Sequence, residues 1–348
     1  MARIASLDQF RGYTVAGMFF VNFAGGFDAI HPLFKHHRTY CSYADTIMPH
    51  FFFAVGFALR LVLSKNRETL GVWPAYRRTL RRIGLLIAIG LGLYLFDWDW
   101  LSLEAWRAPM FSEAHFWRDS FQTLVHIGVT SLWVLPVMAC SPRIRFGFAA
   151  ACALLHILLS VWFWYDLLEA KRVIDGGPLG FLTWTIPTLC GAWAFDIVKG
   201  APERVTGRLI QGAVLLMAGG YLLSCLNQGG RLVPPPFWPA PPPYDLWTMS
   251  QRAGSVSYQT FAAGFSLAVY ATFVWLADQR GWTSRWFAIL GQNALAAYLL
   301  HTLIDVAFEP LKPRDAALWW VLILTASFIM VNTLLVAWLS RRGWFLRL

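Results

Sequence analysis

Charged residues are scarce in this sequence. Asp, Glu, Lys and Arg make up 14% of the 348 residues, whereas hydrophobic residues make up 57% and the mean hydropathy is +0.49. Soluble globular domains carry charge on roughly a quarter of their residues, because most of their surface faces water. The deficit excludes an ordinary soluble domain and indicates a protein that crosses a membrane several times.

Cysteine is also scarce, and its spacing carries no signature. The five cysteines form no CxxC pair, and all but Cys41 lie in or at apolar stretches. We therefore expect neither a disulfide framework nor a zinc site, and no other metal. The N-terminal apolar run lacks a good small-residue cleavage site, so we expect a retained helix rather than a cleaved signal peptide.

Long apolar runs dominate what is present. Ten stretches of about 18 or more mainly apolar residues are long enough to cross a bilayer as helices. They lie at about 12–30, 44–63, 80–97, 120–139, 145–165, 179–198, 206–226, 256–277, 284–304 and 316–339. The connections are mostly short. The sequence predicts an all-α, polytopic bundle of ten transmembrane helices, with residues 1–348 forming a single integral-membrane domain.

Orientation follows from the basic residues, because cytoplasmic loops retain Lys and Arg. With the N-terminus inside, 19 of the 29 Lys and Arg residues are cytoplasmic, whereas 14 of the 19 Asp and Glu residues are outside. Both termini are therefore predicted to be cytoplasmic. The net charge of +10 is spread over many loops, so it does not indicate nucleic acid. It fits contact with anionic membrane lipids, and a phosphate-bearing cytosolic ligand stays open.

The stretch from Val21 to Gly56 is unusually polar for a membrane protein. Apolar helix ends there flank one Asn, two Asp and four His residues. Polar groups at membrane depth are functional candidates. Asn22 lies about ten residues into the first apolar stretch, so at 1.5 Å per residue we expect its amide roughly 15 Å deep, near the midplane.

The loop at 31–43 carries three of these histidines. One interpretation is that these histidines are exposed to solvent and have no function. Because the chain re-enters the membrane at Asp45, we favour a functional role. Neutral imidazole accepts a proton from an attacking amine or hydroxyl, or itself attacks a thioester. Asp45 is placed to orient such an imidazole or to stabilise its charged form.

An acid and a base open the chain. Asp8 and Arg11 lie three residues apart, close enough to pair on one helical face. The simpler interpretation is a solvated helix start at the inner membrane surface. The alternative is that the planar guanidinium of Arg11 binds a phosphate.

A second polar group occurs late in the chain. By helical rise, Asn293 is expected roughly 14 Å deep, near the level of Asn22. His301 then falls toward the outer face, with His50 and His126. If their helices are neighbours, these residues mark a path from the inner to the outer face.

Two outer segments have distinctive compositions. The segment at 98–119 is acidic and rich in Trp, which fits an interfacial aromatic belt and also suits sugar rings. The segment at 226–255 is the longest connection, and its proline run predicts a stiff lid or spacer.

Several motifs occur in a fixed order along the chain. They are SLDQFRG at 6–12, VNFAGG at 21–26, the His-bearing loop, ADTIMPHFFFAVG at 44–56 and GQNALAAYLLH at 291–301. Together they resemble the heparan-α-glucosaminide N-acetyltransferase family of transmembrane acyltransferases. Their order over nearly the whole chain makes the resemblance more specific than any single motif.

The resemblance implies an acyl-CoA-dependent enzyme. In such an enzyme, an acetyl group passes from cytosolic acetyl-CoA to an amino or hydroxyl group of a sugar or glycan outside the cytoplasm. An outer-loop His is the catalytic residue, and it falls on His36 or His37. The spacing to Tyr40 favours His37 slightly. The resemblance also suggests a bacterial plasma membrane and an envelope glycan as acceptor, and it leaves a homodimer open.

The remaining site residues are carried over from the motifs. Asn22 matches the V-N position and Asp45 the A-D position, and both are assigned to catalysis. The late motif supplies Asn293 and His301. These two, together with Asp8 and Arg11 of the first motif, are the expected contacts of acetyl-CoA.

Two other classes stay open at this stage. Buried Asn, Asp and Arg side chains also suit a secondary transporter of an anionic solute, although no inverted repeat is evident. Histidines on several helices, first among them His126 and His156, suit b-type haem.

Overall fold

The computed structural model describes residues 4–95, 117, 120–171, 173–200 and 204–346. Within these ranges every regular element is a helix, which confirms the predicted all-α class. Apart from Trp117, the segment at 98–119 lies largely outside the described residues.

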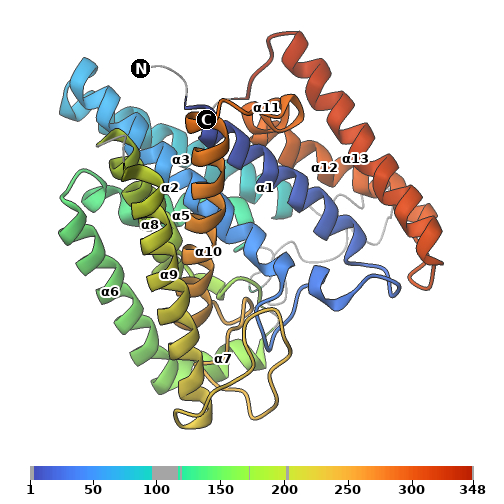
Figure 1. Cartoon of the computed structure of the whole chain (residues 1–348), viewed down its shortest axis with the longest axis horizontal. Helices are drawn as coiled ribbons and strands as arrows, with labels where there is room; N and C mark the ends of the chain where they lie inside the picture. Colours follow the sequence, from blue (N-terminus) through green and yellow to red (C-terminus); the bar gives the residue numbers. More distant parts are fainter. Residues whose placement is uncertain (1–3, 96–116, 118–119, 172, 201–203, 347–348) are drawn as a thin grey trace.

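The helices follow one another through short connections (Figure 1). They are α1 (Ala5–Ala24), α2 (Tyr43–Leu70), α3 (Val72–Leu95), α5 (Thr123–Met138), α6 (Pro142–Leu159), α7 (Tyr165–Ala170), α8 (Phe181–Lys199), α9 (Val205–Ser224), α10 (Val256–Phe273), α11 (Arg285–Gln292), α12 (Ala294–Phe308) and α13 (Leu318–Arg341). π-Helical turns at Ser160–Trp164 and Val274–Gln279 extend α6 and α10.

Seven helical segments in the described residues are long and apolar enough to cross a membrane. They are Tyr43–Leu70, Pro142–Ala170, Gly177–Lys199, Val205–Asn227, Val256–Gln279, Ala294–Leu311 and Leu318–Arg341. The protein is therefore an integral membrane helical bundle. α5 is shorter, with 16 residues, and α1 and α3 carry more polar side chains. Ten crossings and cytoplasmic termini stay predictions.

Two helices differ from their predicted bounds. α1 begins at Ala5 rather than near residue 12, because the polar residues of its first turns are accommodated against neighbouring helices. The stretch expected at 284–304 is two helices, which meet at Asn293 with φ −121° and ψ 36°. Apolar periodicity carries no signal for this break.

Glycines let α2 and α8 pack closely. A Cβ atom at Gly56 would lie 1.7 Å from the carbonyl oxygen of Thr188, and one at Gly191 would lie 1.9 Å from that of Phe53. Both distances are far inside van der Waals contact, so only glycine allows this backbone approach. The crossing places the start of α2, and with it Asp45, against the bundle interior.

α1 and α11 approach one another in the same way. A Cβ atom at Gly12 would lie 1.9 Å from the carbonyl oxygen of Phe287, and one at Gly291 would lie 2.0 Å from that of Asp8. The glycines of the first and last motifs therefore meet in space.

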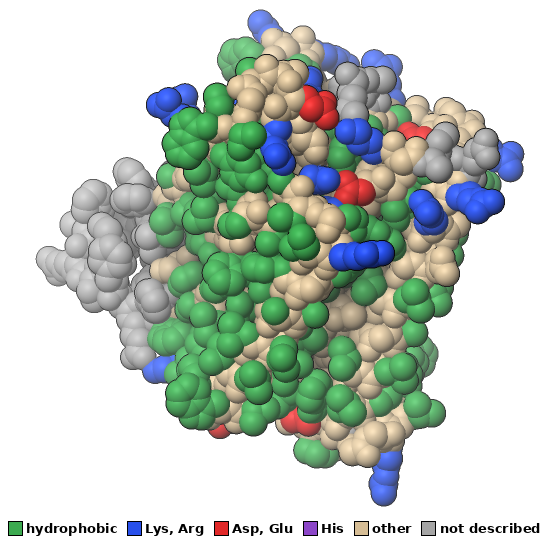
Figure 2. Space-filling model, turned by 90° about the vertical axis from the view of Figure 1, so that its left-hand side faces the viewer, with side chains coloured by type: hydrophobic (Ala, Val, Ile, Leu, Met, Phe, Trp, Pro, Cys, Tyr) green, Lys and Arg blue, Asp and Glu red, His purple; other side chains and the backbone are tan. Residues whose placement is uncertain are grey.

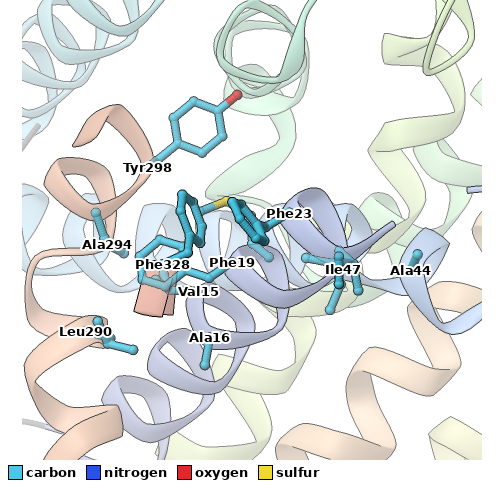
Figure 3. Packing of buried hydrophobic residues seen from close by; sticks show 14 of the residues in the cluster. Val15, Ala16, Phe19, Phe23, Ala44, Ile47, Leu290, Ala294, Tyr298 and Phe328 are labelled. Carbon is cyan, nitrogen blue, oxygen red and sulfur yellow. The ribbon is translucent and has the colours of Figure 1, made fainter. Parts of the chain in front are cut away.

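An aromatic core joins α1, α12 and α13 (Figure 3). Phe23 stacks on Phe328 with ring centroids 4.3 Å apart, and Phe19 meets Phe328 edge to face. In Figure 3 the hydroxyl of Tyr298 points away from these rings. Such buried aromatic pairs hold α13 against α1.

The start of α1 and the end of α13 lie at the same end of the bundle (Figure 1). The backbone N–H of Ser6 donates to Asp278 at 3.1 Å, and the Asn293 amide donates to the carbonyl of Trp344 at 3.1 Å. Figure 2 shows Lys and Arg side chains gathered mainly at this upper end, above a broad hydrophobic surface. This charge distribution is typical of a cytoplasmic face.

Candidate functional site

A cavity of about 440 Å³ lies where the end of α1 meets the starts of α2 and α5. The loop at 35–38, the segments at 173–175 and 251–252, and α12 complete its wall. The lining residues are Met18, Asn22, His36, His37, Arg38, Ala44, Ile47, Met48, Phe51, Gln122, Thr123, Val173, Ile174, Asp175, Gln251, Arg252 and Tyr298. The space suits a small polar ligand or part of a larger one.

His36 and Asp45 form a hydrogen-bonded pair at this cavity. Nδ1 of His36 lies 2.8 Å from Oδ1 of Asp45, whose side chain is fully buried. The His36 side chain is 47% exposed, and it lines the cavity. The carboxylate accepts the Nδ1–H proton of the neutral ring, which leaves the Nε2 lone pair available.

The sequence places Asp45 through a capping box at the start of α2. The hydroxyl of Ser42 accepts from the Asp45 N–H, while Oδ2 of Asp45 accepts from the Ser42 N–H at 2.9 Å. The Tyr258 hydroxyl donates to the Asp45 carbonyl at 2.7 Å. The carboxylate is thus held rigidly, with Oδ1 directed at His36.

Charges around His36 set its proton affinity. Burial among the surrounding loops lowers the pKa of His36, but the hydrogen bond to Asp45 and the charges of Asp45 and Asp175 raise it by more. A hydrogen bond to Gln251 also raises the pKa. The net pKa lies above the ordinary histidine value, so His36 binds a proton readily once one is delivered.

His37 points elsewhere. Its Nε2 lies 2.7 Å from the carbonyl oxygen of Pro32, and its ring stacks on Tyr40 with centroids 4.2 Å apart. The His-to-Tyr40 spacing noted in the sequence thus corresponds to a stacking contact. His36 reaches Asp45, which His37 does not contact.

Asn22 is exposed to the same cavity and is held by His301. The Asn22 amide nitrogen lies 3.4 Å from Nε2 of His301, and Nδ1 of His301 contacts the carbonyl of Tyr298. Since that carbonyl accepts the Nδ1–H proton, Nε2 is the acceptor for the amide of Asn22. The amide therefore has a fixed orientation beside the cavity.

Comparison with known families assigns the chain to one of them. Residues 3–198 match the family described as heparan-alpha-glucosaminide N-acetyltransferase, catalytic, a match that covers more than half of the chain. The chain belongs to this family. No curated protein matches it. The family makes the protein a membrane-embedded transferase, and the matched region includes His36, Asp45 and Asn22.

Asn22 does not lie at the position in its helix that was predicted, and its depth in the membrane stays a prediction. Because α1 begins at Ala5, Asn22 lies two residues before the helix end and not at its middle. His301 is the late-motif residue that meets Asn22, whereas Asn293 donates to Ser340 at 3.0 Å and to Trp344. The two late-motif residues therefore have different partners, Asn293 at the start of α12 and His301 within it.

The other expected donor contacts lie away from the cavity. Asp8, Arg11 and Asn293 are not among its lining residues. They belong to the part of the bundle where α1 packs on α11. Their assignment to acetyl-CoA stays a prediction.

The remaining helical histidines serve separate contacts. His50 bonds the Ser266 hydroxyl at 2.7 Å. The path through His50, His126 and His301 stays a prediction. His126 packs against Phe121 and Trp184 from α5, and His156 lies 3.5 Å from Ser160 on α6.

Sequence reasoning missed two cavity residues. Asp175 and Gln251 lie on loops before α8 and α10, and the Gln251 amide donates to Oδ1 of Asp175 at 2.9 Å. The run Asp175-Gly176-Gly177 is a turn signature. Nothing in the sequence indicates which distant helix such a turn meets.

Proposed function

We propose that this protein transfers an acetyl group from cytosolic acetyl-CoA to an amino or hydroxyl group of a sugar or glycan outside the cytoplasm. The main support is the His36–Asp45 pair, which shares a cavity with the oriented Asn22 amide in a member of this transferase family. The family match also favours a transferase over a transporter or a haem protein.

His36 is the proposed general base. Its Nε2 takes a proton from the acceptor amine or hydroxyl as the nucleophile attacks the thioester carbonyl. The new C–N or C–O bond forms, the C–S bond breaks, and the proton on His36 passes to the departing CoA thiolate. Positioned proton transfer of this kind contributes about 10²–10⁴-fold in rate.

Asn22 is the proposed donor to the carbonyl oxygen. Negative charge develops on that oxygen during attack, and a preoriented amide stabilises it without reorganisation. His301 holds the Asn22 amide in place, so its proposed role is to orient Asn22.

The donor enters from the cytoplasmic end in this proposal. The CoA phosphates rest on inner basic residues, with Arg11 at the start of α1 among them and Asp8 placed to orient its guanidinium. The pantetheine arm passes Asn293 toward the cavity. A bidentate guanidinium suits phosphate better than a lysine does. No step of the chemistry depends on a metal.

The proposal also includes the surroundings of the protein. The chain forms one domain in a bacterial plasma membrane, with ten crossings and both termini cytoplasmic. The acceptor is an envelope sugar or glycan, anionic lipids contact the inner basic residues, and a homodimer is compatible with these roles.

The deciding experiment uses purified protein in liposomes. Radiolabelled acetyl-CoA is added on the cytoplasmic side with a panel of amino sugars and envelope glycans on the other side. We expect labelled acceptor from the wild type, and none from His36→Ala. Absence of transfer to every acceptor, from every acyl-CoA tested, would refute the proposal.

His37→Ala is the matched control. It removes a neighbouring imidazole that does not contact Asp45, so we expect transfer within a few-fold of wild type. If His37→Ala abolishes transfer and His36→Ala does not, the roles assigned to the two histidines are reversed. Label retained on the protein without acceptor would indicate an acetyl-histidine intermediate instead of direct transfer.

A further inference from the structure

We propose that Asp175 is a positioning residue of the catalytic centre, which acts on His36 through Gln251 from the edge of the imidazole that Asp45 leaves free. The inference rests on the proposed function. It adds a second carboxylate, from a loop that none of the motifs includes.

The backbone at Asp175 is the first observation. Its φ is +56°, in the left-handed region that non-glycine residues rarely adopt. The carbonyl of Asp175 accepts from the Trp184 indole at 2.8 Å, and the next N–H, of Gly176, donates to the Arg252 carbonyl at 2.9 Å. A strained conformation held by several contacts is typical of functional sites.

The bridge to His36 is the second observation. The Gln251 amide nitrogen donates to Oδ1 of Asp175 at 2.9 Å. The same side chain is hydrogen-bonded with His36, where it favours the charged ring. Since Nδ1 of His36 bonds Asp45, the Gln251 carbonyl accepts from Nε2–H once His36 has taken its proton, and the Nε2 lone pair of the neutral ring stays available to the acceptor. Asp45, His36, Gln251 and Asp175 therefore form one chain of contacts along the cavity.

Burial of Asp175 is the third observation. The side chain is 4% exposed, and it lines the cavity. Burial raises the pKa of Asp175 to about 7, although the charge of His36 and the bond from Gln251 lower it. Its charge is therefore favoured when His36 is protonated, which is the state that follows attack by the acceptor.

Other charged groups around His36 do not take this role. The titratable and charged groups that line the cavity around it or bond it are Asp45 from α2, His37 and Arg38 from its own loop, and Asp175 and Arg252 from the facing loops. The Arg252 guanidinium donates to the carbonyls of Leu168, Glu169 and Lys171. The guanidinium is thereby directed at the end of α7 rather than at the carboxylate of Asp175.

The test variant is Asp175→Asn, because Asn has the same shape and also tolerates the left-handed conformation. Loss of the carboxylate lowers the pKa of His36. The base then stays neutral to lower pH, so the acidic limb of the rate profile should move down by about one pH unit. We expect kcat at the plateau to fall roughly tenfold, since a weaker base takes the proton less well. The KM for acetyl-CoA should not change.

A second readout does not need activity. Histidine carbons labelled with ¹³C report the titration of His36 by NMR, with His36→Ala identifying the signal. Its midpoint should fall in Asp175→Asn and, by less, in Gln251→Leu. Asp166→Asn, an exposed acid on α7, is the matched control and should leave midpoint and rate profile unchanged.

The outcomes separate the two proposals. If the wild type transfers no acetyl group, the proposed function fails, and the NMR midpoint still tests the action of Asp175 on His36. If transfer occurs and Asp175→Asn keeps both the wild-type limb and the wild-type midpoint, the inference about Asp175 is wrong. If Asp175→Asn does not fold, Gln251→Leu provides the test. An unchanged titration midpoint of His36 in that variant equally contradicts the inference about Asp175.

Discussion

At the residue scale, two adjacent histidines have different surroundings. His36 contacts a buried carboxylate, whereas His37 contacts the carbonyl of Pro32 and the ring of Tyr40. In an irregular loop, side-chain direction depends on each backbone dihedral, so residues one position apart can point to different sides. The slight preference for His37 rested on spacing along the chain, and spacing in a loop does not determine contact.

A prediction for Asn22 belongs to the same scale. Asn22→Ala removes the amide proposed to stabilise charge on the thioester oxygen, so we expect kcat to fall about 10²–10³-fold. His301→Ala leaves the Asn22 amide in place but removes the residue that orients it, so kcat should fall by less than in Asn22→Ala. Steady-state kinetics and calorimetric titration of CoA check this. A rise in the CoA dissociation constant with unchanged kcat would instead assign Asn22 to binding.

At the scale of elements, the bundle depends on close crossings. α2 carries Asp45 and α8 follows the Asp175 loop, and the two helices meet where Gly56 and Gly191 leave no room for a side chain. The distance between these helices therefore affects the geometry of the cavity. Small residues have this role in membranes because packing replaces the hydrophobic effect as the main attraction between helices.

Gly191→Ala tests this crossing. A methyl group 1.9 Å from the Phe53 carbonyl oxygen forces the helices apart, and overpacking costs typically about 1–3 kcal/mol. We expect a lower unfolding temperature in detergent and reduced acetyl transfer. Gly84→Ala on α3 is the control, because no atom lies within 4 Å of its added Cβ. Equal unfolding temperatures for the two variants would show that the crossing tolerates a side chain.

At the scale of the whole molecule, charge and hydrophobic surface are segregated. Lys and Arg gather mainly at the end where α1 starts and α13 finishes (Figures 1 and 2). The cavity lies toward the other end of α1, at Met18 and Asn22. In the proposed topology the basic end is cytoplasmic, so the cavity lies toward the outer side of the membrane. The proposed donor then reaches it through the bundle, and the proposed acceptor approaches it from outside.

Cysteine labelling in intact cells tests this orientation. Leu232→Cys and Trp73→Cys place a thiol at positions that are 80% and 74% exposed, on opposite predicted sides. A membrane-impermeant maleimide should label Leu232→Cys without lysis and Trp73→Cys only after lysis. The reverse pattern would invert the topology, and the wild type measures background from its own cysteines.

The sequence alone determined the class of the protein and the approximate position of most of its helices. Apolar runs and scarce charge leave few alternatives to a membrane bundle, because each helix must satisfy its own backbone in lipid. The motif order likewise identified the family, which the match over residues 3–198 confirms. The motifs also identified Asn22 and Asp45 as candidate site residues and narrowed the candidate catalytic histidine to His36 or His37, since these residues lie within local motifs.

Only the tertiary structure decided which of these residues meet. Asn22 pairs with His301 across 279 positions, and Asp175 joins Gln251 across 76. Such contacts depend on helix bounds, the break at Asn293 and close glycine crossings. A shift of a few residues in a helix start moves a side chain by several ångströms along the axis. The pattern of apolar residues does not specify those shifts. A helix that starts a few residues earlier or later still buries a similar apolar face.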